Sequence, residues 1–155
     1  MSLGGNQQLQ ELAQQIQELE QQKEAVQGEI EALRAEQTEI DEAVEAIEKL
    51  NTDSTVQVPL GGGAYVRATV EDIKEIIVDL GADYAAERDE AGAVSTLESK
   101  RDTLDERIED LQSEIAEIET GTQDLESRAQ QMQQQQMQQM QGRLGGEGDG
   151  GPDEE

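Results

Sequence analysis

The amino-acid sequence contains no cysteine and no histidine. These two absences exclude several kinds of chemistry, because zinc clusters, thiol nucleophiles, imidazole bases and disulfides each need one or both residues. A chain without cysteine is compatible with a reducing compartment, so we expect a cytoplasmic protein. The first ten residues have neither a basic start nor an apolar run, so we expect no signal peptide and no membrane partner.

Aromatic residues are almost missing as well. The 155 residues include no Phe, no Trp and two Tyr, and 34% of them are hydrophobic. A chain of this length has room for about one domain, but this composition cannot build a large globular core. An enzyme that used carboxylates alone would need a shielded pocket to separate their pKa values. We therefore predict that the protein is not an enzyme and has no cofactor.

The charge of the chain is one-sided, since 37 Asp and Glu against 11 Lys and Arg leave a net charge of −26. A nucleic-acid-binding arm needs a basic stripe to displace counterions, and the sequence has none, so we expect no nucleic-acid partner. Many exposed carboxylates are typical of adaptation to molar salt, where the Debye length falls to about 3 Å and screens their repulsion. We predict a halophilic protein.

The chain does contain long heptad repeats, in the segments 6–50 and 90–141. In the first segment the a positions hold Leu9, Ile16, Lys23, Ile30, Gln37 and Val44, and the d positions hold Leu12, Leu19, Val26, Leu33, Ile40 and Ile47. In the second they hold Val94, Arg101, Ile108, Ile115, Thr122 and Ala129 at a, and Leu97, Leu104, Leu111, Ile118, Leu125 and Met132 at d. A spacing of three and four sustained this long predicts a left-handed coiled coil.

The two helices most simply pair with each other, because the insert at 54–88 is long enough to reverse the chain. In the antiparallel register that matches the apolar positions, the numbers of facing residues sum to 141. The polar a residues then face aliphatic ones: Lys23 faces Ile118, Gln37 faces Leu104, Arg101 faces Ile40 and Thr122 faces Leu19. Such interruptions usually fix the register of a coiled coil at some cost in stability.

The insert changes the apolar period from 3.5 to 2. Val56, Val58 and Leu60 alternate with polar residues, glycines 61–63 can turn the chain, and the alternation resumes over 64–70. With a one-residue gap, the segment 78–84 aligns with 58–65. We therefore predict two related β-hairpins. The glycine run is not a phosphate-binding loop, since a strand follows it and no Lys does.

Two hairpins do not form a stable sheet by themselves, because their strand edges are exposed. We also expect the helices, which are occupied in the coiled coil, to leave the apolar strand faces uncovered. Strands of partner subunits must then pair with these hairpins and complete the β-sheet through which the subunits assemble. The apolar residues predicted to take part in assembly are Val56, Val58, Leu60, Val66, Ile76, Val78 and Leu80. No acidic segment matches a calcium-binding EF-hand loop, so no metal site is predicted.

With its order of helix, two hairpins and helix, the sequence resembles the prefoldin family over nearly the whole chain. The likeness is carried by 56–70, with the turn Val58, Pro59, Leu60 and Gly61, and by 76–84, with Val78, Asp79, Leu80 and Gly81. The second hairpin favours the archaeal alpha type, since beta subunits of the family carry one hairpin.

This resemblance implies an α+β fold that is mostly helical, in which an antiparallel two-helix coiled coil is joined by two β-hairpins that complete an inter-subunit β-barrel. It further implies a hexamer of two alpha and four prefoldin beta subunits. Such proteins act as chaperones without ATP, capturing unfolded polypeptides at the coiled-coil tips and delivering them to a group II chaperonin. A structural coiled-coil scaffold without clients remains the alternative.

The register locates a client surface at the coiled-coil tip, where both termini lie and where residues after about 136 have nothing opposite them. Methionine is flexible and polarisable and suits surfaces that accept varied partners. Together with the resemblance, this exposed apolar patch predicts a client site made of Leu3, Leu9, Met132, Met137, Met140 and Leu144. The alternative is a soluble, fraying, glutamine-rich helix end. In either case we expect a disordered acidic tail at 145–155.

Overall fold

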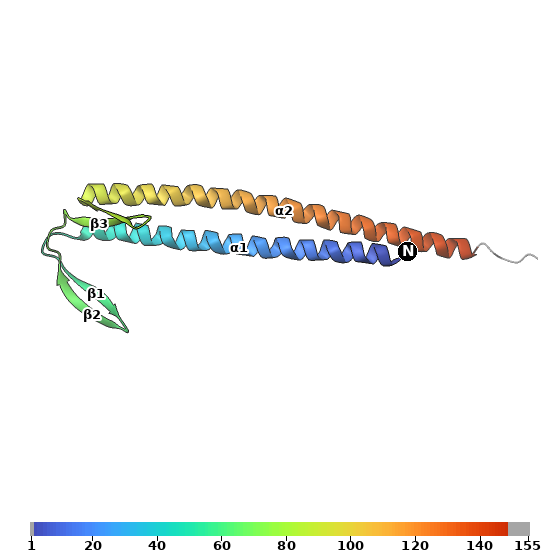
Figure 1. Ribbon diagram of the computed structural model, residues 1–155, viewed down its shortest axis with the longest axis horizontal. Coiled ribbons are helices and arrows are strands. Elements are labelled where there is room, and N and C mark those ends of the chain that lie inside the picture. The colour runs from blue at the N-terminus through green and yellow to red at the C-terminus, as the bar shows by residue number, and fades with distance from the viewer. Residues whose placement is uncertain (1, 149–155) are drawn as a thin grey trace, which may run out of the picture. The chain divides into compact units, whose positions relative to one another are not determined.

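The computed structural model describes the backbone of residues 2–148 and the side chains of residues 4–143. Its elements, in chain order, are α1 (Ser2–Lys49), β1 (Thr55–Gly61), β2 (Ala64–Thr69), β3 (Ile76–Gly81), β4 (Tyr84–Arg88) and α2 (Glu90–Gly148) (Figure 1). Two long helices joined by two antiparallel hairpins confirm the predicted fold class. Helix α2 continues to Gly148, into the segment 145–155 that we expected to be disordered, and residues 149–155 lie outside the described part.

The chain divides into two compact units. The central unit is Ile30–Asp110, which contains all four strands and the adjoining helix segments, and the terminal unit combines Met1–Glu29 with Leu111–Glu155. Helix formation in both units follows from composition, because Glu, Gln, Ala, Leu and Arg, all strong helix formers, occupy most positions. Helix α2 begins with a cap in which the Asp89 carboxylate accepts a hydrogen bond from the Gly92 N–H at 2.7 Å.

The a and d positions of both helices, here called the seam, are the side chains removed from water. In the central unit Ile30, Gln37, Ile40 and Ile47 of α1 and Leu97 and Ile108 of α2 are buried; in the terminal unit Val26, Leu111 and Ile118 are. The other seam residues of the heptads, from Leu9 and from Val94 onward, are half-buried. This burial confirms the predicted seam.

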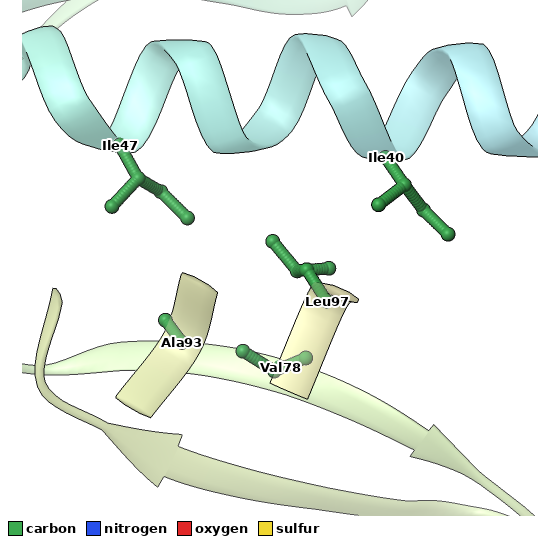
Figure 2. Packing of buried hydrophobic residues seen from close by; sticks show 5 residues of the cluster. All are labelled: Ile40, Ile47, Val78, Ala93 and Leu97. Carbon is green, nitrogen blue, oxygen red and sulfur yellow. The ribbon is translucent and has the colours of Figure 1, made fainter. Parts of the chain in front are cut away.

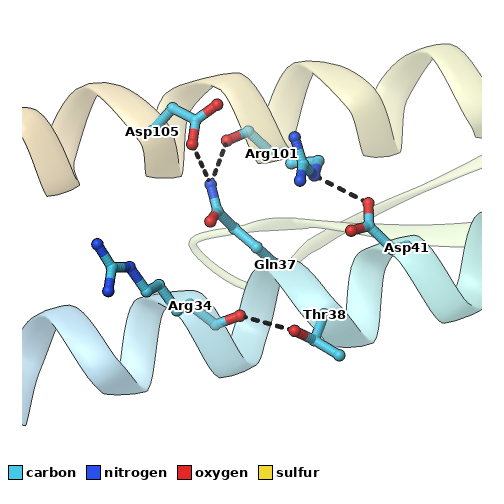
Figure 3. A network of polar contacts seen from close by, with 6 residues as sticks. All are labelled: Arg34, Gln37, Thr38, Asp41, Arg101 and Asp105. Carbon is cyan, nitrogen blue, oxygen red and sulfur yellow. Dashed lines mark hydrogen bonds and ion pairs between the residues drawn. The ribbon is translucent and has the colours of Figure 1, made fainter.

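Polar contacts in the central unit agree with the predicted register (Figure 3). The buried Gln37 amide donates to Asp105 Oδ1 at 2.6 Å and to the Arg101 carbonyl at 3.2 Å. Arg101 turns outward, with its Nε 2.8 Å from Asp41 Oδ1. The groups that Gln37 contacts lie one and three residues from its expected partner Leu104, and the group that Arg101 contacts lies one residue from Ile40. The polar ends of both side chains point out of the apolar layer.

The terminal unit keeps the same register. Lys23 Nζ lies 2.9 Å from Glu119 Oε1, beside the expected partner Ile118. A Cβ placed on Gly121 would lie 3.6 Å from Leu19, and one placed on Gly5 would meet the Gln136 side-chain amide directly. Since exposed ion pairs contribute little to stability, we take the Lys23 pair as a marker of register rather than a source of stability.

The two hairpins have matching geometry. In the first, Val58 pairs with Val66 and Gly61 with Ala64; in the second, Val78 pairs with Ala86 and Gly81 with Tyr84. Each loop therefore has two residues, both with positive φ, as a type I′ turn requires. The one-residue gap in our sequence alignment was wrong, because Tyr84 occupies the position of Ala64 rather than that of Tyr65.

Strand β3 packs against both helices (Figure 2). Val78, only 5% exposed, forms a buried cluster with Ile40 and Ile47 of α1 and with Ala93 and Leu97 of α2, and Ile76 packs against this cluster. The Lys100 ammonium also donates to the Asp79 carbonyl at 2.9 Å. Our expectation that the helices leave the strand faces uncovered was therefore wrong for one face of β3.

The second turn contains a residue whose conformation is unfavourable. Ala82 has φ = 52°, and this left-handed conformation costs a residue with a Cβ about 1–2 kcal/mol. After the entropic cost of glycine, roughly 0.5–1 kcal/mol, Ala82→Gly should still raise the free energy of unfolding by about 0.5–1 kcal/mol. Thermal circular dichroism in high salt measures this as a higher melting temperature. Ala85→Gly, in strand β4, is the matched control and should lower it.

Candidate functional site

The end of α2 presents the exposed methionines of the terminal unit. Gln136 lies against Gly5, so in this register α1 has few residues left to face the part of α2 that follows. Met137 and Met140 are accordingly each 66% exposed. Since they are three residues apart on a helix, they share one face.

A hollow of about 530 Å³ lies beside these methionines in the terminal unit, and we call it the tip hollow. It is lined by Gly5, Asn6, Gln8, Met132, Gln135, Gln136, Gln139, Met140 and Arg143. A second hollow of about 360 Å³ adjoins it, lined in part by Leu12, Arg128 and again Met132. An apolar thioether surface surrounded by amides can contact aliphatic side chains while hydrogen-bonding an extended backbone.

The predicted client-binding residues are thus placed differently. Met132 and Met140 line the tip hollow and Met137 is exposed next to it. Leu9 is half-buried in the seam, so part of its side chain is occupied by helix pairing. The side chains of Leu3 and Leu144 lie outside the described residues.

The charge of the chain is also unevenly distributed. Segments 1–10 and 127–146, here called the acid-free segments, contain no Asp or Glu and only Arg128 and Arg143 as charged residues. All 37 carboxylates, with nine cations, fall elsewhere in the sequence. Interface centres are depleted of charged groups because their desolvation is costly. The acid-free segments therefore supply the part of this highly charged chain best suited to cover an apolar partner.

The hairpins carry further exposed apolar side chains, in the central unit. These are Val58, Leu60, Tyr65 and Val66 of the first hairpin and Ile77, Leu80 and Tyr84 of the second. Val56 and Ile76 are half-buried, while Val78 faces the chain's own core. Among the described residues each hairpin is its own two-stranded sheet, so every strand has one edge unpaired within the chain.

Sequence reasoning missed three of these residues, namely Tyr65, Ile77 and Tyr84. Ile77 and Tyr84 are each 72% exposed. A signal was present for Ile77, because three consecutive apolar residues, Ile76 to Val78, are typical of a strand buried on both faces. One face of β3 is covered by the helices, and the other, with Ile77, is exposed.

Within the part of the chain that the structure describes, no group of three or more acidic side chains is arranged to hold a metal ion. Over the same residues, neither helix has a stretch that is both long and apolar enough to cross a lipid bilayer. The features that remain for function are the tip hollow with its methionines and the exposed hairpin faces.

Comparison with known proteins identifies the kind of molecule that carries these two surfaces. The family model described as Prefoldin subunit matches residues 19–135. The chain belongs to the prefoldin family. Prefoldins are chaperones. The match confirms the family that the sequence was found to resemble in its order of helix, two hairpins and helix.

Among curated relatives, the Prefoldin subunit alpha of Haloarcula marismortui is 66% identical over 113 residues, which cover 73% of each chain. That of Halorubrum lacusprofundi is 68% identical over 109 residues, or 70% of this chain and 72% of the relative. The prefoldin alpha subunit of Methanosarcina mazei is 32% identical over 98 residues, or 59% of this chain and 69% of that one. The relatives with high identity are thus prefoldin alpha subunits from haloarchaea.

Solved structures agree on the fold. The prefoldin beta subunit from Thermococcus strain KS-1 matches with a TM-score of 0.53 and 21% identity, over 80% of this chain and 90% of that one. A filamentous PFD from Methanocaldococcus jannaschii, solved by cryo-EM, matches with a TM-score of 0.52 and 24% identity, over 79% and 98%. At sequence identities this low, the two matches show that the prefoldin chain shares their fold, and nothing more.

Proposed function

We propose that this prefoldin subunit captures unfolded polypeptides at the tip of its coiled coil, without ATP, and passes them to a group II chaperonin. The observation that carries the capture step is the exposure of Met137 and Met140 beside the tip hollow, in segments without carboxylates. Membership of a chaperone family and the flexibility of methionine both support it. Transfer to a chaperonin rests on family membership.

We also propose that the subunit works in a hexamer of two alpha and four beta subunits. Two-stranded hairpins are marginal by themselves, and this chain leaves Ile77, Leu80 and Tyr84 exposed on one of them. Strands of neighbouring subunits would pair with the open edges and cover these side chains, forming a β-barrel between subunits. The capture sites would then be carried on several arms, and their combined binding would exceed the affinity of one site.

The test of capture replaces Met137 and Met140 together by Gln. Exposed Gln keeps the helix and the length of the side chain but removes the thioether, so we expect normal assembly and markedly weaker suppression of client aggregation. The measurement is light scattering after a chemically unfolded protein is diluted into molar salt containing the assembled complex. Truncation after Gln131 is less selective, because it also removes seam residue Met132 and the Gln136 contact with Gly5.

Gln133→Ala with Gln138→Ala is the matched control, since both residues are exposed and neither lines the tip hollow. It should protect as well as the unchanged complex. If the methionine double variant protects equally well, clients bind elsewhere. If the unchanged complex gives no protection at all, the subunit is a scaffold rather than a capture device.

A further inference from the structure

Oxidation chemistry in this chain is concentrated at the tip. The sequence has no Cys, no Trp and no His, and three of its four methionines lie within residues 132–140. Thioethers are therefore the side chains most easily oxidised by peroxides in this protein. All three belong to the terminal unit, whereas the strands proposed to mediate assembly belong to the central unit.

The three sulfur-bearing side chains are open to small molecules. Met137 and Met140 are 66% exposed, and Met132 and Met140 line the tip hollow of about 530 Å³. Their surroundings are glutamine amides and Arg143, which can donate hydrogen bonds to a newly formed sulfoxide oxygen. The product of oxidation would thus be stabilised where it forms.

We propose that Met132, Met137 and Met140 form a reversible oxidation site that weakens client binding, an inference that rests on the proposed capture function. In the forward step the methionine sulfur attacks one oxygen of hydrogen peroxide or an organic hydroperoxide, the O–O bond breaks, and the S=O bond forms. The sulfur loses two electrons, and water or the alcohol leaves. In the reverse step a methionine sulfoxide reductase uses two thiols, which are oxidised to a disulfide and supply two electrons and two protons, so that the thioether is restored and water is released.

The effect on capture follows from the polarity of the product. A sulfoxide turns a flexible apolar side chain into a polar one, so the tip loses its apolar contacts with the client. The helix should survive, because Met137 and Met140 already face water and have little packing to lose. Assembly should also survive, since the hairpin residues contain no sulfur.

The experiment oxidises the purified subunit with hydrogen peroxide, removes the peroxide with catalase, and then assembles the subunit with untreated beta-type partners. Mass spectrometry counts the oxygen atoms added at each methionine. We expect the concentration of complex that halves aggregation of an untreated client to rise roughly tenfold. A tenfold change corresponds to about 1.4 kcal/mol, no more than the burial of one or two methionine side chains supplies.

Two further arms make the result specific. A triple variant, Met132→Leu with Met137→Leu and Met140→Leu, has no thioether at the tip and retains Met1, so peroxide should leave its own level of protection, whatever that level is, unchanged. Treatment of the oxidised complex with a methionine sulfoxide reductase and a thiol should restore protection. Undiminished protection by a fully oxidised wild-type complex would overturn the oxidation switch alone, whereas absence of protection before oxidation would overturn the capture function beneath it.

Discussion

Transfer of the assembled protein from molar KCl to about 0.1 M KCl is expected to melt the helices or dissociate the complex. Every described Asp and Glu side chain is exposed, and with 11 cations for 37 carboxylates, at least 26 carboxylates cannot have a cation of their own. Like charges at i,i+3 or i,i+4, such as Glu42 with Glu45 and Asp102 with Glu106, destabilise a helix by about 0.2–0.5 kcal/mol per pair.

The salt concentration determines how strongly these like-charged side chains repel one another. Many such pairs add up to an energy comparable with the whole stability of a domain, about 5–15 kcal/mol. Lowering the salt from 1 M to 0.1 M lengthens the Debye distance from about 3 to about 10 Å, so repulsion along each helix is no longer screened. Little offsets this repulsion, since ion pairs such as Lys49 with Glu45 are exposed and contribute little.

Helical circular dichroism against KCl concentration, with size-exclusion chromatography in parallel, measures the effect. Lowering the pH to about 4 at low salt should partly restore the helix, because acid protonates part of the carboxylates and so weakens their mutual repulsion. Sucrose is a control, as it favours compact states without screening charge, and it should restore less helix than KCl at equal osmolality. A complex that is equally stable at 0.1 M and at molar KCl would contradict adaptation to salt.

The seam could be predicted from the sequence because heptad spacing is a local property that repeats many times. All a and d positions of α1 from Leu9 to Ile47 are buried or half-buried, and so are those of α2 from Val94 to Met132. The register also followed, since an antiparallel pairing shifted by one heptad would leave one end residue, Ile47 or Val94 depending on the direction, without a facing residue in the other helix. Gln37 and Arg101 then needed only to direct their polar ends out of the apolar layer.

The docking of β3 could not be predicted in the same way, because it uses helix positions outside the heptad rule. Ala93, which is fully buried, precedes the a position Val94, and its small side chain allows close approach in the cluster that contains Val78. Ile73, also buried, lies between the hairpins and donates its N–H to Thr52 Oγ1 at 3.1 Å. Single contacts of this kind leave no periodic signal.

Of the two candidate surfaces, the tip was predicted more completely than the hairpin faces, for a related reason. Met137 and Met140 could be assigned to the tip because α2 outlasts its partner helix, which is a matter of counting residues along the register. The exposed hairpin residues Tyr65, Ile77 and Tyr84 were missed, because strand alternation assigns a single apolar face. For Ile77 and Tyr84 of the second hairpin, this other face becomes evident once Val78 is seen to pack against the helices; for Ile77, the run of three apolar residues already indicated it.

Ile77→Asp is expected to abolish the large complex while leaving the helices folded. Ile77 is 72% exposed in the single chain, so an aspartate there costs the isolated subunit little. In the assembly it would place an unpaired carboxylate inside an apolar interface, at a cost of about 3 kcal/mol or more, which is more than a hundredfold in dissociation constant. Val78→Pro would not separate these effects, because Val78 also belongs to the subunit's own core.

Size-exclusion chromatography with light scattering, in molar salt and over a range of protein concentrations, measures the loss of assembly caused by Ile77→Asp. Ser113→Asp is the matched control, since it adds the same charge at an exposed position of α2 and should assemble normally. Far-ultraviolet circular dichroism of both variants should match the unchanged protein, because neither residue belongs to the seam. A complex of unchanged size and affinity with Asp at residue 77 would show that the open face of β3 remains in water, and that assembly uses the first hairpin instead.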